Sequence, residues 1–321
     1  MTKITWARLA LLTTAFLWGT SLTVVKTAAS VFPPHLILTA RFTLAALLLG
    51  IIYFRKLKQI RFSDVKAGLL IGLFLFLAYS SQTLGVTFAD PGRSGFLSAS
   101  YCVIVPFLFW AVERTRPDKY HVAAAVLCVA GVFCISLSGS SGSIFPITRS
   151  ELLGDGLALL SGFLFACHIV AVTKSGKNRD PITMTLLQFI SAAFFSLIIT
   201  LLFEDTTVLA VTSLRPIGEL LYLAVLCTAV SLLLQNIGQK YCDPSSAAII
   251  LGFESIFGVI FPVALGIEHL TVSSVVGFIF IFIAIIVSET KLSFLKKKTA
   301  SVYVKSSENV TISDKPPAVT L

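Results

Sequence analysis

The feature that most constrains this chain is a succession of apolar runs, each long enough to cross a lipid bilayer as a helix. At a rise of about 1.5 Å per residue, a helix needs about 20 residues to cross a hydrocarbon layer of about 30 Å. The sequence therefore predicts an all-α membrane protein with ten transmembrane helices. The ten segments are Ala7–Ser30, Leu36–Phe54, Ala67–Phe88, Ser94–Val112, Tyr120–Leu137, Leu152–Thr173, Pro181–Phe203, Ile217–Gln239, Pro244–Gly266 and Val272–Ser288.

The composition argues against a soluble globule and against an outer-membrane barrel. Hydrophobic residues make up 56% of the 321 residues and charged residues only 13%, which is too little polar material to cover a globule in water. Most of the 26 Phe lie inside long apolar runs, whereas barrel strands read as short alternating segments. The six cysteines form no CxxC pair and have no histidine at ligand spacing, so we expect no metal site and no cofactor.

Lys and Arg are distributed unequally between the two sides of the predicted bundle. With the N-terminus inside, the cytoplasmic segments hold 20 basic residues, and the outer loops hold only Arg93, Arg149 and Arg215. Short cytoplasmic loops carry such an excess of positive charge. The distribution predicts cytoplasmic termini, an even number of spans and a multi-pass protein of the cytoplasmic membrane. The net charge of +9 therefore reflects orientation and lipid contact, and we expect no nucleic-acid partner.

The sequence repeats itself between the third and eighth spans. QTLGVTFADP at residues 82–91 and QNIGQKYCDP at residues 235–244 share four identities at a shift of 153. Each half then holds five spans, and an odd number forces the second copy to enter the membrane from the opposite side. We expect a first repeat at 1–139, a linker at 140–151, an inverted second repeat at 152–290 and a disordered basic cytoplasmic tail at 291–321.

Several short motifs along the chain occur in a characteristic order and spacing. They are Trp18 and Gly19, Arg41 and Phe42, Glu113 in ERTRPD, GDGLALL at Gly154, and the hairpin from QNIGQK to DPSSAAI. With these motifs the chain resembles the EamA family, the ten-helix branch of the drug/metabolite transporter superfamily, over roughly residues 7–290. The resemblance implies transport of small metabolites, often amino acids or their analogues, through a central cavity bounded by spans one, three, four, six, eight and nine. The sequence departs from the family pattern at Phe165, where a tryptophan would match Trp18, and at Ser255, where proline is common.

Polar residues inside the predicted spans are candidates for the lining of such a cavity. Span eight carries Thr228, Ser231, Gln235 and Gln239 at steps of three and four, which places them on one helix face. Span three places Tyr79 and Gln82 one turn apart, and Gln82 is the repeat equivalent of Gln235. Interhelical hydrogen bonds that only hold the bundle together are the alternative role.

Glu254 is the residue that most strongly indicates a functional site, because an ionised carboxylate in the middle of a span is costly. It is a candidate proton carrier or amine-binding group, and a neutral carboxyl bonded to a neighbouring helix is the structural alternative. Its repeat equivalent at the shift of 153 is Tyr101. His168 in span six could pair with Glu254 for proton coupling, or be a buried core histidine. Trp18 either walls the cavity or packs in the ordinary way.

Three residues are candidates for gating. Pro91 and Pro244 each begin a span directly after an aspartate, where the missing N–H costs nothing and a hinge can form. Arg41 lies near the outer end of span two, where it could accept an anionic group, snorkel to the interface or pair within the bundle.

The sequence therefore predicts a secondary active transporter that works by alternating access. Its expected partners are a small-molecule substrate, membrane lipid and protons, in a monomer or a dimer. The chain lacks a Walker run, HExxH and GxSxG, so we expect no enzyme. A non-transporting scaffold or receptor and a membrane-embedded enzyme are the alternatives.

Overall fold

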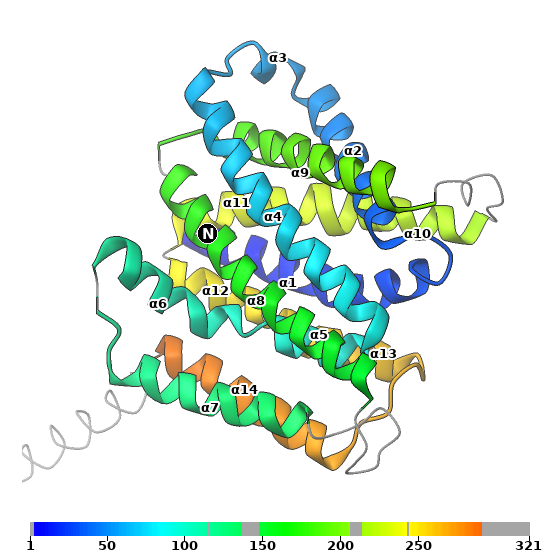
Figure 1. Ribbon diagram of the computed structural model, residues 1–321. Coiled ribbons are helices and arrows are strands. Elements are labelled where there is room, and N and C mark those ends of the chain that lie inside the picture. Colours follow the sequence, from blue (N-terminus) through cyan, green and yellow to red (C-terminus); the bar gives the residue numbers. More distant parts are fainter. Residues whose placement is uncertain are drawn as a thin grey trace, which may run out of the picture.

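The structure is a computed structural model that describes residues 3–114, 116–136, 148–176, 178–205, 214–242 and 244–290. Every element of regular structure within these ranges is a helix (Figure 1). Most of the predicted linker and the whole predicted tail lie outside the described residues. The helices are α1 (Lys3–Ala28), α2 (Pro34–Ile52), α3 (Phe54–Leu57), α4 (Phe62–Phe88), α5 (Pro91–Ser98), α6 (Tyr101–Glu113), α7 (Lys119–Ser136), α8 (Arg149–Gly176), α9 (Pro181–Phe203), α10 (Leu214–Ala224), the π-helix η2 (Val225–Val230), α11 (Ser231–Tyr241), α12 (Pro244–Gly252), α13 (Glu254–Ala264) and α14 (Val272–Thr290).

The apolar helices follow the predicted spans, so an all-helical membrane protein is confirmed. Seven helical stretches in the described ranges are long and apolar enough to cross a membrane, and α5 with α6 and α10 to α11 each count as one stretch. Three shorter apolar helices, Lys119–Cys134, Ile250–Ala264 and Val272–Val287, coincide with the fifth, ninth and tenth predicted spans. The total of ten crossings and the side of the termini stay predictions.

Two spans are broken near their middle. The first break, at Ala99 and Ser100, separates α5 from α6, and the second, at Phe253, separates α12 from α13. At both breaks the chain makes tight hydrogen bonds three residues back, as from Cys102 N–H to the Ala99 carbonyl at 3.1 Å and from Ile256 N–H to the Phe253 carbonyl at 3.1 Å. At each break the span changes to tighter bonding for about one turn inside the bundle, and a new α-helix then begins.

A stretch of π-helix changes the register of the span that contains α10 and α11. Within η2 the Thr228 hydroxyl donates to the Leu223 carbonyl, five residues earlier, at 2.7 Å. A π-helical turn inserts an extra residue into an α-helix and is frequent at functional sites. The hydroxyl thereby satisfies a carbonyl that the altered register leaves free, and the polar face of α11 is turned toward α1.

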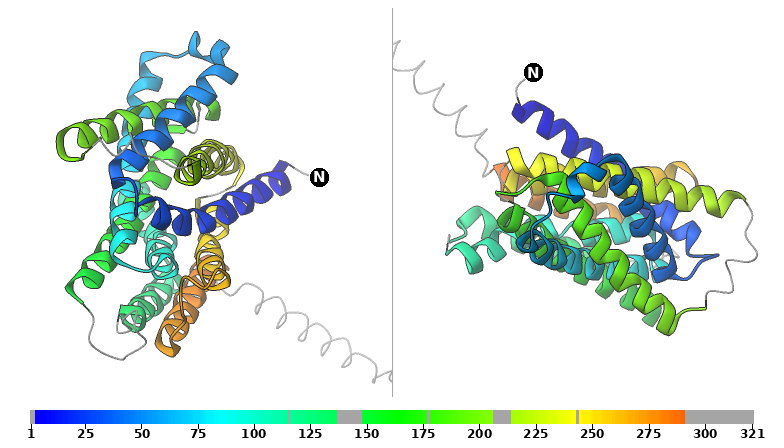
Figure 2. Two further views of the ribbon diagram at one scale, coloured as in Figure 1. Left: turned by 90° about the vertical axis from the view of Figure 1, so that its right-hand side faces the viewer. Right: turned by 90° about the horizontal axis from the view of Figure 1, so that it is seen from above.

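Helices from the two halves of the chain interleave rather than forming separate bodies. The helix α4 runs along α8 and α9, and α1 packs on both α11 and α13. Figures 1 and 2 show α7 and α14 side by side at one edge of the bundle. Glycine permits the closest approaches, since a Cβ on Gly19 would collide with the α13 backbone and one on Gly72 with the α9 backbone. Small residues at helix crossings serve this purpose in membranes.

Candidate functional site

A small enclosed cavity lies at the centre of the bundle, where the two broken spans meet α1, α4 and α8. Its volume is about 10 Å³, which is close to the room that one water molecule occupies. Five of the predicted cavity residues come together in its wall, although they are spread over more than 200 residues of sequence. The lining residues are Trp18, Ser21, Leu22, Tyr79, Gln82, Tyr101, Phe165 and Glu254.

The helix breaks position the two residues that the repeat pairs at a shift of 153. Tyr101 is the first residue of α6 and Glu254 is the first residue of α13, so each follows the break in its own span. Both side chains are buried, Glu254 at 4% exposure and Tyr101 at 1%. The Tyr101 hydroxyl lies within electrostatic range of the Glu254 carboxylate. Two half-helix N-termini therefore present a phenol and a carboxyl to one cavity.

Aromatic rings form the rest of the wall around Phe165. Its ring centroid lies 5.3 Å from that of Tyr79, 6.3 Å from that of Trp18 and 6.3 Å from that of Tyr101. The sequence identified Phe165 only as the residue that replaces a tryptophan, and missed it as the ring on which the other three converge. Its position at the repeat equivalent of Trp18 is the sequence signal that would have identified Phe165 as a cavity residue.

The polar face of span eight runs from the wall of this cavity to the lining of a second and larger one. The Trp18 indole Nε1–H donates to the Ser231 hydroxyl at 3.0 Å. Gln235 and Gln239 follow Ser231 at steps of four on α11, and all three side chains are buried. The larger cavity has a volume of about 390 Å³. Its lining is Ile71, Phe109, Glu113, Val172, Thr173, Lys174, Gly176, Pro181, Met184, Asn236, Gln239, Lys240 and Cys242.

Several polar atoms along this face are buried without a hydrogen-bond partner. They include Oε1 of Gln235, both side-chain polar atoms of Gln239 and Oδ1 of Asn236. These atoms lie along the face of α11 that runs from Ser231, beside Trp18, to Gln239 in the lining of the larger cavity. The larger cavity lies at the end of the bundle near Lys174, here called the Lys174 end.

His168 does not face Glu254. It is 1% exposed, and its Nε2 lies within hydrogen-bond distance of the Gln188 Oε1 on α9, at 3.1 Å. The structure thus places His168 outside the lining of the central cavity, one turn after Phe165. The proposed His168 and Glu254 pair is absent in this conformation.

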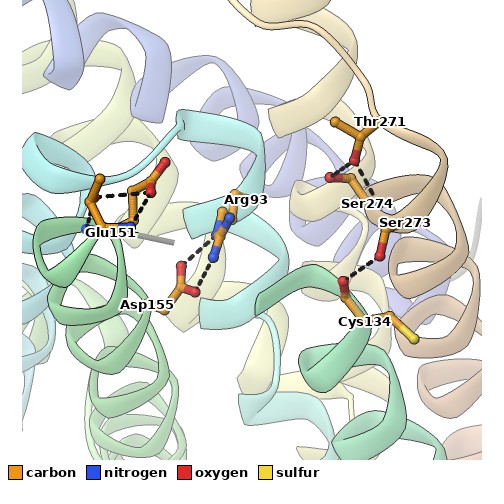
Figure 3. A network of polar contacts seen from close by, with 8 residues as sticks. Arg93, Cys134, Glu151, Asp155, Thr271, Ser273 and Ser274 are labelled. Carbon is orange, nitrogen blue, oxygen red and sulfur yellow. Dashed lines mark hydrogen bonds and ion pairs between the residues drawn. The ribbon is translucent and has the colours of Figure 1, made fainter. Parts of the chain in front are cut away.

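The opposite end of the bundle, where α1 and α4 finish and α5 begins, is here called the Arg93 end. The Arg93 Nε–H donates to the Asp155 carboxylate at 2.6 Å, and its Nη2 also contacts that carboxylate, so α5 and α8 are joined by a buried bidentate pair (Figure 3). The Gly92 N–H donates to the Glu268 carboxylate at 2.8 Å, which joins α5 to the α13–α14 loop. Both acids come from the second half of the chain.

Glu268 lies in this loop and is 7% exposed. Burial, opposed by hydrogen bonds from the Gly92 and Arg93 amides and reinforced by the nearby Asp90 charge, raises the pKa of Glu268 to about 7. The sequence missed Arg93, Asp155 and Glu268 as a group. Each reads as a charge near the end of a span, which is normally a solvated position.

The predicted gate residues have different surroundings. Pro91 occupies the first turn of α5, next to Gly92 and Arg93, whose bonds to Glu268 and Asp155 close this end of the bundle. Pro244 begins α12. Arg41 is buried in α2, where its Nε–H donates to the Thr228 hydroxyl at 3.0 Å and its guanidinium lies over the Tyr79 ring. Lys26, also inside a predicted span, donates to the carbonyls of residues 86, 87 and 89 and thereby caps the end of α4.

Comparisons with known proteins extend this picture. The model of the EamA-like transporter family matches the chain twice, at residues 5–137 and 152–290. An uncharacterized transporter of Archaeoglobus fulgidus is 32% identical over 289 residues, which is 89% of this chain and 86% of that protein. The uncharacterized transporter YvbV of Bacillus subtilis is 25% identical over 297 residues, 91% of this chain and 94% of its own. A crystal structure that covers 90% of this chain and 98% of its own matches with a TM-score of 0.66 at 17% identity, which shows a shared fold.

Proposed function

The chain belongs to the EamA-like transporter family, and on that premise we propose that it is a secondary active transporter of small metabolites, such as amino acids or related compounds, in the cytoplasmic membrane. It is a multi-pass membrane protein, and its relatives are named as transporters. The observation that carries the proposal is the central cavity at the meeting point of two broken spans. Discontinuous helices at mid-membrane form the substrate sites of many secondary transporters.

Alternating access is supported by the difference between the two ends of the bundle. The Lys174 end holds a cavity of about 390 Å³, and the Arg93 end is closed by the Arg93–Asp155 pair and the bond from Gly92 to Glu268. By the distribution of Lys and Arg, the Lys174 end is cytoplasmic. The described conformation is then closed to the outside, with a contracted central site that must widen to hold a solute.

The two matches of the family model support two five-span halves at 1–139 and 152–290, inverted relative to each other. The equivalent positions of Tyr101 and Glu254 after the breaks support the same arrangement. In an inverted repeat the two halves can exchange conformations, which opens the centre first to one side and then to the other.

Glu254 is the residue to which we assign proton or amine binding. It forms no ion pair in the described part of the chain, and it lies in the wall of the cavity beside two phenols. A carboxyl without a basic partner can take up either a proton or a cationic amine when the cavity opens. The proposed solute path is completed by six further side chains, Trp18, Tyr79, Gln82, Tyr101, Ser231 and Gln235. His168 on α8 lies outside the cavity lining, and we assign it a supporting role in the wall of this path.

The decisive experiment is uptake into proteoliposomes of a panel of amino acids, amines and neutral metabolites, with and without a pH gradient. Glu254→Gln is expected to abolish stimulation by the gradient, because an amide cannot carry the proton. Glu219→Gln is the control, since Glu219 pairs with the exposed Arg215 away from the cavity. Wild-type protein that accumulates no solute above empty liposomes refutes transport, and a Glu254→Gln variant with normal pH dependence refutes the assignment of Glu254.

A further inference from the structure

Arg41 is a buried basic side chain that the described residues leave without an acidic partner. Its side chain is 1% exposed on α2, inside a predicted span. One nitrogen, Nε, donates to the Thr228 hydroxyl, but Nη2 is buried with no hydrogen-bond partner. No acidic side chain of the described residues lies within ion-pair distance of it. Charges inside a membrane protein are normally paired, and a guanidinium group keeps its positive charge in proteins.

Arg93 shows what a structural arginine looks like in the same molecule. It is also buried, at 4% exposure, but both forks of its guanidinium meet the Asp155 carboxylate (Figure 3). A bidentate carboxylate is the geometry that a guanidinium fork matches best. Arg41 therefore differs from Arg93 by the absence of a resident carboxylate, and not by its burial.

Arg41 lies directly behind the wall of the central cavity. Its guanidinium carbon is 4.8 Å from the centroid of the Tyr79 ring, and Tyr79 lines the cavity. Tyr79 lies within electrostatic range of both Arg41 and Glu254. On another side, Arg41 lies near Cys227, which contacts the cavity-lining Ser21. The Tyr79 ring therefore stands between the Arg41 guanidinium and the cavity that holds the Glu254 carboxyl, and access of a solute to Arg41 requires this ring to move.

We propose that Arg41 recognises a carboxylate of the transported solute, so that the site takes amphoteric solutes with the acid at Arg41 and the amine at Glu254. This inference rests on the proposed transport function and adds the residue that selects the anionic group. A single carboxylate fits better than a phosphate, because a dianion would lie in the field of Glu254. The solute then supplies the counter-charge that the fold lacks.

The first test needs no solute. Arg41→Gln is expected to melt at or above the wild-type temperature in detergent, because it removes an unpaired buried charge. Glutamine fits the site by symmetry, since the shift of 147 that relates Trp18 to Phe165 also relates Arg41 to Gln188 on α9. Arg93→Gln is the matched control and is expected to melt lower, because it leaves Asp155 buried without a partner. An Arg41→Gln variant destabilised as much as Arg93→Gln would show that Arg41 is structural, and would overturn the proposal.

The second test uses L-amino acids and the matching amines that lack the carboxylate, in proteoliposome uptake. Wild type is expected to prefer the carboxylate-bearing member of each pair by at least about ten-fold, and Arg41→Gln to lose this preference while Arg41→Lys keeps part of it. Equal uptake of both members by wild type, or an unchanged preference in Arg41→Gln, overturns the proposal. If wild type accumulates neither, the transport function is what fails, and the melting comparison still decides the role of Arg41.

Discussion

The closure at the Arg93 end should depend on external pH through Glu268. In the closed conformation the pKa of Glu268 is about 7, compared with an ordinary value of 4.5. An open end would expose the carboxyl to water and restore the ordinary pKa. The closed form therefore binds one more proton between these values, so acid favours closure and the closed form loses stability as the pH rises to about 7. One pKa unit corresponds to about 1.4 kcal/mol, so the full effect is about 3 kcal/mol, or roughly two orders of magnitude in the ratio of closed to open.

The assay is the rate at which an impermeant thiol reagent labels a cysteine from outside. Ser94→Cys, in a background without the six native cysteines, places the reporter at a fully buried position of α5 next to the closure. Labelling is expected to rise from pH 5 to pH 8 by far more than in the same reporter with Glu268→Gln. The glutamine stays neutral at both pH values and can still accept the Gly92 bond, so the variant reports only the intrinsic chemistry of the thiol. Equal pH profiles in the two proteins would refute the reasoning.

Three further predictions concern stability, each measured by thermal or denaturant unfolding. Gly19→Ala places a Cβ against the α13 backbone and should cost about 1–3 kcal/mol, and an unchanged melting temperature would mean that α1 and α13 are not in close contact. Asp180→Ala removes the cap that accepts the Thr183 N–H and should cost about 1 kcal/mol at neutral pH. Partial burial raises the pKa of Asp180, but hydrogen bonds from Lys56 and Thr183 outweigh burial and leave that pKa lowered. The loss of stability in Asp180→Ala should therefore shrink as the pH falls below 3.8. A loss that stays constant with pH would contradict the role of Asp180 as a charged cap. Lys26→Met leaves three carbonyls at the end of α4 without their donor and should destabilise the protein, whereas Lys26→Arg should retain most of the stability.

The parts of the fold that depend on periodicity and length could be predicted from the sequence. The apolar runs gave the positions of the helices because the hydrocarbon thickness fixes their length. The polar face of Ser231, Gln235 and Gln239 was predicted to point inward, and the structure confirms that these side chains are buried. The equivalence of Tyr101 and Glu254 followed from the shift of 153, and both residues stand directly after a helix break.

The parts that depend on tertiary neighbours could not be predicted. The stretch VLCTAV of η2 is apolar and reads as an ordinary α-helix, because a π-helical turn has no residue signature of its own. The sequence favours a pair between His168 and Glu254, since both side chains can titrate, but the structure places the His168 ring next to Gln188 of α9. Arg93 and Asp155 are 62 residues apart, and nothing local joins them.

The central claim is that one polar site opens alternately to the two sides of the membrane. The most direct test is the labelling of Gln82→Cys, in the cysteine-free background, by an impermeant thiol reagent added to one side at a time. The account predicts labelling from the cytoplasmic side, and slower labelling from the outside that becomes faster when Asp155→Asn releases Arg93 and weakens the closure. A cysteine at residue 82 that stays unlabelled from both sides, or that is labelled from outside equally with and without Asp155→Asn, would contradict it.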